Sequence, residues 1–171
     1  MRDDVRDLIA KIEGDDPSAR ENAVLDLMYR MEDSTKHIFK NGVVIDDKYL
    51  SQDEQIELIH TLIKLAESLR PEYASLLFVV SKGIPIIMID PVQDFVLKYA
   101  DVMPNHMLQQ SLVALWNCMR PAKGSRDYET IKEKMKYDQI MMKLRRIEMH
   151  VNMLERVLKD TLSCIEVFSK E

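Results

Sequence analysis

The chain has few of the residues on which disulfide, zinc and phosphate-binding sites depend. Its 171 residues include two cysteines and four glycines. Two cysteines are too few for a disulfide scaffold or a four-cysteine zinc site, and the glycines are too scattered for a phosphate-binding loop. The longest purely apolar runs, residues 76–80 and 86–89, are far shorter than the roughly 20 residues of a membrane helix. Residues 1–7 are too charged for a secretory signal, so we expect a cytoplasmic protein without membrane association.

No residue pattern indicates a catalytic centre or a bound metal. The four histidines are His37, His60, His106 and His150. No two of them stand four residues apart, as the paired histidines of a helical metal site do. We expect Cys118 and Cys164 to be inert buried thiols. The sequence therefore predicts no catalytic residue, no metal ligand and no cofactor.

Helix signals occur along nearly the whole chain. Hydrophobic residues make up 46% and charged residues 31%, which is typical of a folded domain. Residues 16–21 offer either an Asp-Pro start or a Ser–Glu capping box, and Ser51 with Glu54 forms a second capping box. Asp-Pro at residues 90–91 repeats the first signal. We expect Gly14 to end a helix through a left-handed cap.

These signals predict an all-α fold in two parts. Residues 1–119 read as a compact domain of about six helices in stacked pairs, with Trp116 facing inward. Residues 120–124 contain Pro121 and Gly124 and break the chain. Residues 125–171 contain no glycine or proline, which indicates one long helix or a helical hairpin with heptad character.

Residues 16–27, with the sequence DPSARENAVLDL, resemble the start of the second helix of a HEAT or armadillo repeat. Residues 20–27 align with residues 108–115 at an offset of 88, which is twice 44, a period within the ~40–47 residues of such repeats. The resemblance is loose over residues 90–119. It implies a curved helical stack with a groove for a partner, a tight helix contact at Ala23, and pairing of Arg20 with carbonyls or acids of the neighbouring turn. A capped amphipathic helix of any fold has the same pattern.

The strongest periodic signal lies in the last third of the chain. Large apolar residues alternate there in steps of three and four, as in a heptad seam. The seam consists of Ile140, Leu144, Ile147, Val151, Leu154, Leu158, Leu162 and Ile165. So apolar a stripe must be covered, either by the N-terminal helices or by a second chain. Because residues 1–119 hold enough apolar side chains for their own core, we predict a homodimer through this seam.

The net charge of −5 is unevenly distributed. Residues 1–119 carry 12 basic and 20 acidic side chains, whereas residues 120–146 carry nine basic and four acidic ones. If the basic segment binds phosphates, its contacts would be Lys132, Lys136, Lys143, Arg145 and Arg146. A solvated helix face or an internal ion-paired surface is the favoured interpretation.

Three functions are compatible with this sequence. The leading hypothesis is a non-catalytic protein–protein interaction or scaffold protein that presents a helical surface. The second is a nucleic-acid-associated protein that uses the basic segment 120–146. The third is an enzyme whose site is assembled from residues on distant helices.

Overall fold

The computed structural model describes residues 1–41, 49–148 and 155–171, and its regular structure over these ranges is entirely helical. This confirms the predicted all-α class. The elements are α1 (Asp3–Glu13), α2 (Pro17–Asn41), α3 (Gln52–Ala66), the 3-10 helix η1 (Pro71–Tyr73), α4 (Ala74–Val80), α5 (Pro85–Tyr99), α6 (Asn105–Asn117), α7 (Arg126–Lys134), α8 (Tyr137–Glu148) and α9 (Glu155–Lys170). None of these helices is long and apolar enough to cross a membrane.

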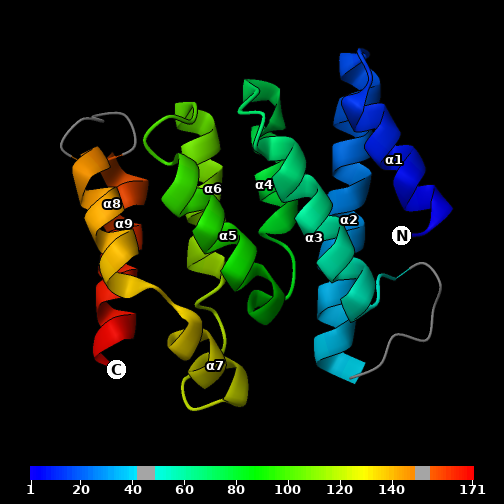
Figure 1. Ribbon diagram of the computed structural model, residues 1–171. Helices are drawn as coiled ribbons and strands as arrows, with labels where there is room; N and C mark the ends of the chain where they lie inside the picture. Colours follow the sequence, from blue (N-terminus) through cyan, green and yellow to red (C-terminus); the bar gives the residue numbers. More distant parts are fainter. Residues whose placement is uncertain (42–48, 149–154) are drawn as a thin grey trace.

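The helices stack as pairs in two layers (Figure 1). The pairs are α1–α2, α3–α4, α5–α6 and α8–α9. In one layer α2, α4, α6 and α9 pack against each other in that order, and in the other α3, α5 and α8 do the same. The short helix α7 joins the third pair to the fourth at one end of the molecule and packs on α5. The predicted stack of helix pairs is therefore observed.

A single hydrophobic core runs through the whole stack. It extends from Val5 on α1 to Phe168 on α9. The turn at residues 120–124 interrupts the helices but not the core, since α9 packs on α6 while α7 and α8 pack on α5. Residues 125–171 thus close the stack that residues 1–119 begin.

Two predicted helix starts are observed with their caps. Helix α2 begins at Pro17, and the Asp16 carboxylate accepts hydrogen bonds from the amides of Ser18 (2.9 Å) and Ala19 (3.3 Å). Ser51 Oγ accepts from the Glu54 amide at 3.2 Å, while the Glu54 carboxylate accepts from the Ser51 amide at 2.8 Å. The second pair of bonds is a complete capping box. These starts therefore depend on neighbouring residues alone.

The end of α1 differs from the prediction. The helix stops before Gly14, but Gly14 has φ −71°, so a left-handed cap is not the reason. Instead Arg20 donates from Nε to the Ile12 carbonyl at 3.1 Å and from Nη2 to the Gly14 carbonyl at 2.8 Å. Ala23 is buried in the core. These contacts match what the HEAT resemblance implies for Arg20 and Ala23, while membership in that family stays an interpretation.

Helix α5 begins six residues earlier than the Asp-Pro signal at residues 90–91 predicted. It starts at Pro85, and Pro91 lies inside it. Pro85 suits the first helical position, where its missing N–H costs nothing. An internal proline removes one backbone hydrogen bond. The extra turns bury Met88 and Ile89 completely, and this burial offsets the lost bond.

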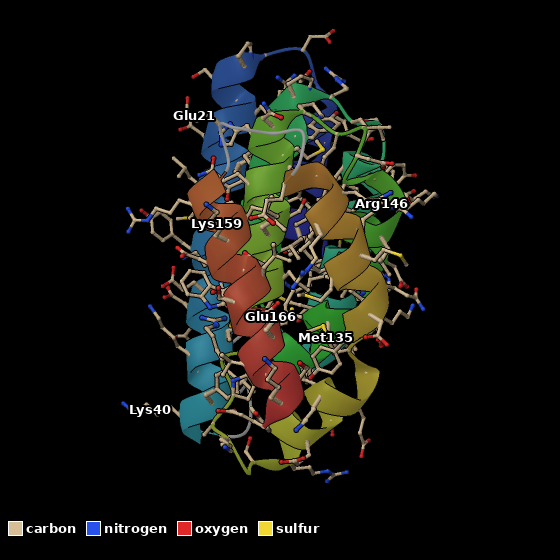
Figure 2. The ribbon with its side chains drawn as sticks, turned by 90° about the vertical axis from the view of Figure 1, so that its left-hand side faces the viewer. Glu21, Lys40, Met135, Arg146, Lys159 and Glu166 are labelled. Carbon is tan, nitrogen blue, oxygen red and sulfur yellow. The ribbon has the colours of Figure 1, made fainter. Side chains whose placement is uncertain are left out.

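The described residues of the last third form α7, α8 and α9 rather than one long helix, and Met135 and Lys136 separate α7 from α8. Gln93 of α5, which is fully buried, holds this break from both sides. Its Nε2 donates to the Lys134 carbonyl at 3.0 Å, and its Oε1 accepts from the Lys136 amide at 3.1 Å. Figure 2 shows Met135 at this turn, below α8. The hairpin alternative, formed by α8 and α9, is the arrangement observed.

Candidate functional site

The described members of the predicted interaction seam lie in the core of the chain itself. Ile140, Leu144, Ile147, Leu158, Leu162 and Ile165 are all buried. Helices α8 and α9 pack on each other and on α5 and α6, and these contacts cover the seam. Val151 and Leu154 lie outside the described residues. The expectation that a second chain must cover the seam is corrected accordingly, because the helices of residues 1–119 leave an apolar side that α8 and α9 occupy.

The basic segment mainly pairs with acidic residues of the same chain. The Lys136 ammonium lies 2.7 Å from the Asp94 carboxylate, and the Lys143 ammonium lies 2.7 Å from that of Asp101. The hydrogen bond from Lys143 is the largest cause that lowers the pKa of Asp101. Both acids belong to α5 or the turn that follows it. The segment thus fastens α7 and α8 to α5.

The other basic residues named above are also placed. Arg145 pairs with Glu166 across the α8–α9 hairpin. Arg146 is exposed on α8, and Lys132 is half-buried on α7. Lys143 and Arg146 line one hollow together with Asp101, while Lys136 pairs with Asp94 and Arg145 with Glu166.

Metal-binding residues do not gather in the described part of the chain. No group of three His, Cys, Asp or Glu side chains is close enough there to hold an ion. Burial raises the pKa of the Cys118 thiol well above its ordinary value, as expected for an inert thiol. Cys164 differs from the prediction, since it is only half-buried and lines a surface hollow.

Exposed apolar side chains concentrate on one layer of the stack. The large exposed ones are Leu25, Tyr29, Phe39, Ile56, Val102, Trp116, Met142 and Val167. Helices α2, α6 and α9 carry five of these eight, and all three helices belong to the α2–α4–α6–α9 layer. Trp116, which was expected to face inward, is 47% exposed, because the fully buried Leu112 and Leu115 already fill the inward face of α6.

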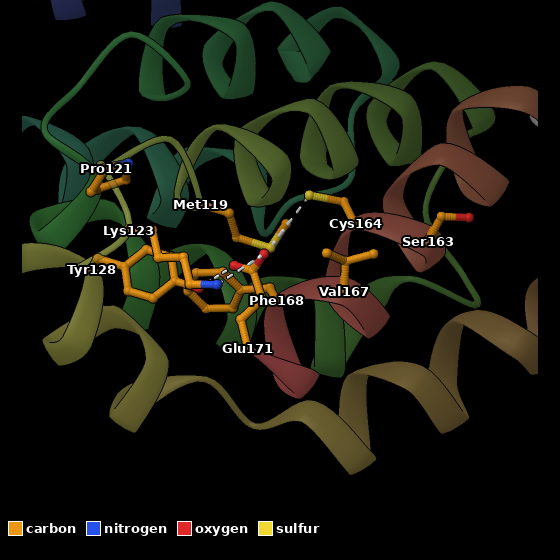
Figure 3. A pocket seen from close by; sticks show the side chains of 9 residues that line it. All are labelled: Met119, Pro121, Lys123, Tyr128, Ser163, Cys164, Val167, Phe168 and Glu171. Atoms are coloured by element: carbon orange, nitrogen blue, oxygen red, sulfur yellow. Dashed lines mark hydrogen bonds and ion pairs between the residues drawn. The ribbon is translucent and has the colours of Figure 1, made fainter. Parts of the chain in front are cut away.

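A surface hollow lies between α9 and the chain that follows α6, from Met119 to the first turn of α7. This hollow, the α6–α9 hollow, has a volume of about 450 Å³. Its lining residues are Met119, Pro121, Lys123, Tyr128, Ser163, Cys164, Val167, Phe168 and Glu171 (Figure 3). Most of the lining is apolar, and Val167 at its edge is 58% exposed. An apolar hollow beside an exposed tryptophan is typical of a surface that binds another protein.

Sulfur and aromatic groups form the inner side of the α6–α9 hollow. Cys164 Sγ lies 3.9 Å from Met119 Sδ. Burial raises the pKa of Cys164, although a hydrogen bond with Trp116 acts in the opposite direction. The thiol therefore stays protonated near neutral pH, and it contributes packing surface rather than a nucleophile. Methionine adapts its shape to a partner, so the hollow suits an apolar side chain.

Polar groups close one end of the α6–α9 hollow. The Tyr128 hydroxyl donates to the Glu171 carboxylate at 2.7 Å, which raises the pKa of Tyr128 to about 12. The Lys123 ammonium lies 3.6 Å from the same carboxylate. The bond from Tyr128 is the largest cause that lowers the pKa of Glu171. This end is consequently an ordered, charged rim beside an apolar floor.

A further hollow of about 360 Å³ lies in the same layer, between α2 and α4. Leu25 and Met28 of α2 line it together with Phe78 of α4. The Lys82 ammonium lies 4.8 Å from the centre of the Phe78 ring, within cation–π range. The layer thus has apolar hollows near both ends of the stack.

Sequence reasoning did not identify the exposed surface residues, since the helical pattern indicates which side chains are apolar but not which remain uncovered. Trp116, Val167 and Phe39 belong to helices that also contribute many buried apolar residues to the core. The one sequence signal for an exposed apolar residue was a position at the edge of its helix's apolar stripe. No protein-family model, curated protein or solved structure matches this chain.

Proposed function

We propose that this protein is a non-catalytic protein-binding module of the cytoplasm and that it binds its partner with the α2–α4–α6–α9 layer. The observation that carries the proposal is the α6–α9 hollow, whose apolar floor lies beside the half-exposed Trp116. Tryptophan and methionine are enriched at protein interfaces, and tryptophan is often one of the few residues that dominate binding energy. Two free cysteines suit a reducing compartment.

The rigidity of the stack supports this role. The α6–α9 hollow is lined by α9, the first turn of α7 and the turn that follows α6, and its Met119, Tyr128 and Phe168 belong to the continuous core. Side chains that are fixed by packing keep the geometry of a binding site. A partner therefore finds an apolar surface that is already ordered, which lowers the entropy cost of association.

The nucleic-acid alternative receives less support from the contacts. Lys136 and Lys143 each lie within 2.7 Å of a carboxylate of the same chain. A phosphate would have to displace these carboxylates, whereas nucleic-acid-binding proteins keep their basic side chains available for phosphates.

The decisive experiment compares two exposed valines. Val167 is 58% exposed at the α6–α9 hollow, and Val102 is 64% exposed in the turn between α5 and α6. Purified parent protein, Val167→Asp and Val102→Asp are each immobilised and incubated with extract of the organism that makes the protein. We expect the parent and Val102→Asp to retain the same protein from the extract, and Val167→Asp to lose it. The aspartate at position 167 would be an unpaired charge buried in an apolar interface, and removing such a charge from water costs free energy.

Thermal unfolding of both variants checks that each is folded before binding is compared. The proposal fails if the parent retains no protein above the level of an uncoated support. It also fails if Val167→Asp retains the partner as well as the parent does.

A further inference from the structure

A second apolar hollow adjoins the α6–α9 hollow at Pro121. This hollow, the Phe39 hollow, has a volume of about 330 Å³ and is lined by residues from the end of α2, the start of α5 and the turn before α7. Phe39 is 60% exposed at its edge, and Pro85 and Ala122 also line it. Pro121 lines both hollows. It therefore forms a ridge with an apolar depression on each side.

Basic side chains stand on both sides of this ridge. Arg120 lines the Phe39 hollow and Lys123 lines the α6–α9 hollow. Residues 120–126 include a third cation, Arg126, and no acid. Lys40 and Lys170 neighbour lining residues of the two hollows in sequence. The linings of the two hollows also include the acids Asp127 and Glu171, but residues 120–126 alone carry three cations in a chain whose net charge is −5.

The acids near the ridge are largely engaged already. Glu171 accepts from the Tyr128 hydroxyl and pairs with Lys123. Asp127 lies in the first turn of α7, where a carboxylate complements the helix N-terminus. The Arg120 guanidinium donates to the Asn117 carbonyl at 3.1 Å. Its charge is one of the smaller causes that lower the pKa of Glu32, but no ion pair among the described residues includes Arg120. Lys123 is 65% exposed, so its ammonium has donors left for a second carboxylate.

We propose that this end of the molecule binds an extended acidic segment of the partner protein. The segment crosses Pro121, places one apolar side chain in each hollow, and directs carboxylates at Arg120 and Lys123. The inference rests on the proposed protein-binding function and specifies the chemistry of the partner. Complementary charge also attracts such a segment to this end, whereas the acidic remainder of the chain repels it.

The test selects peptides from a phage-displayed library of random 12-residue sequences on the immobilised parent protein. We expect enriched peptides that combine Asp or Glu with two or more large apolar residues. The affinity of the best peptide is then measured by fluorescence anisotropy for the parent and two charge-reversal variants. Arg120→Glu should weaken binding on the order of tenfold or more, because it places like charges together. Higher salt should weaken binding to the parent.

Arg146→Glu is the matched control. Arg146 is an exposed arginine on α8, and Figure 2 shows it in the upper part of the view, whereas Lys40 lies in the lower part. We expect this variant to bind the peptide within about twofold of the parent, because a charge beyond a Debye length is largely screened. Equal weakening by both variants would overturn the inference. So would an empty selection or selected peptides without acidic residues.

A DNA duplex of 12 base pairs is measured in parallel, since phosphates also attract cations. Duplex binding as tight as peptide binding would overturn the choice of an acidic peptide. If the parent retains a protein from the extract that Val167→Asp loses, but the selection yields no acidic peptide, the proposed function stands and this inference is wrong. If neither experiment yields a ligand, both fall.

Discussion

Helix boundaries in the first and last parts of the chain are fixed by different physical means. Helices α2 and α3 begin directly after the capping residues Asp16 and Ser51, whose side chains accept hydrogen bonds from amides two or three residues further along the chain. The break between α7 and α8 is instead held by Gln93, which lies more than forty residues earlier in α5. The residues that fix the first two boundaries are therefore neighbours in sequence. For the break between α7 and α8, the residue that forms the hydrogen bonds, Gln93, is far away in sequence.

The same difference extends to the charges. Three lysines of the basic segment pair with acids on α5 or just after it, namely Lys134 with Asp90, Lys136 with Asp94 and Lys143 with Asp101. Their acceptors are about forty residues away in sequence. In the sequence a block of positive charge is compatible with a nucleic-acid-binding segment and with an internal ion-paired surface, and only the folded chain shows which of its lysines pair with acids of the same chain.

The largest expected effect comes from the seam. Leu144 is fully buried on α8, so Leu144→Ala should lower the free energy of unfolding by about 2–5 kcal/mol, the usual cost of a cavity in a core. Urea unfolding followed by circular dichroism measures this loss. If the seam served only a dimer, the midpoint would depend on protein concentration; we expect no such dependence. Met142→Ala, at a half-exposed side chain of the same helix, is the control and should change stability little.

A smaller effect is expected at the clamp between α7 and α8. Gln93→Leu keeps the size of the side chain but removes both hydrogen bonds to the break, which should cost about 1–3 kcal/mol. Amide exchange should accelerate at Lys136, whose N–H donates to Gln93. Gln139→Leu, on the exposed side of α8, should leave that amide unchanged. Equal exchange in both variants would show that the break does not depend on Gln93.

The smallest effect tests the local boundary. Ser51→Ala removes the hydroxyl that accepts from the Glu54 amide, and a lost cap of this kind costs about 0.5–2 kcal/mol. Ser51→Asp should restore most of that loss, because aspartate also caps. Thermal unfolding compares the three proteins. Unchanged stability in the alanine variant would mean that tertiary packing alone fixes the start of α3.

The candidate site was less predictable than the fold. The apolar periodicity of α6 and α9 is visible in the sequence and placed most of their side chains correctly in the core. Whether Trp116 or Leu115 would remain exposed depended on how α4 and α9 pack against α6, because adjacent residues of one helix point only about 100° apart. The positive end around Pro121 was part of the basic segment, yet its apolar neighbour Phe39 lies some eighty residues away.

The sequence alone determined that the protein is helical and where α2 and α3 begin, because capping and periodicity act over four residues or fewer. It also determined that the last third needs apolar cover. The tertiary structure decided that the cover is α5 and α6 of the same chain, that α5 extends through Pro91, and that Gln93 divides α7 from α8. These outcomes depend on burial and hydrogen bonds between residues far apart in sequence, whose energies exist only once the helices have stacked.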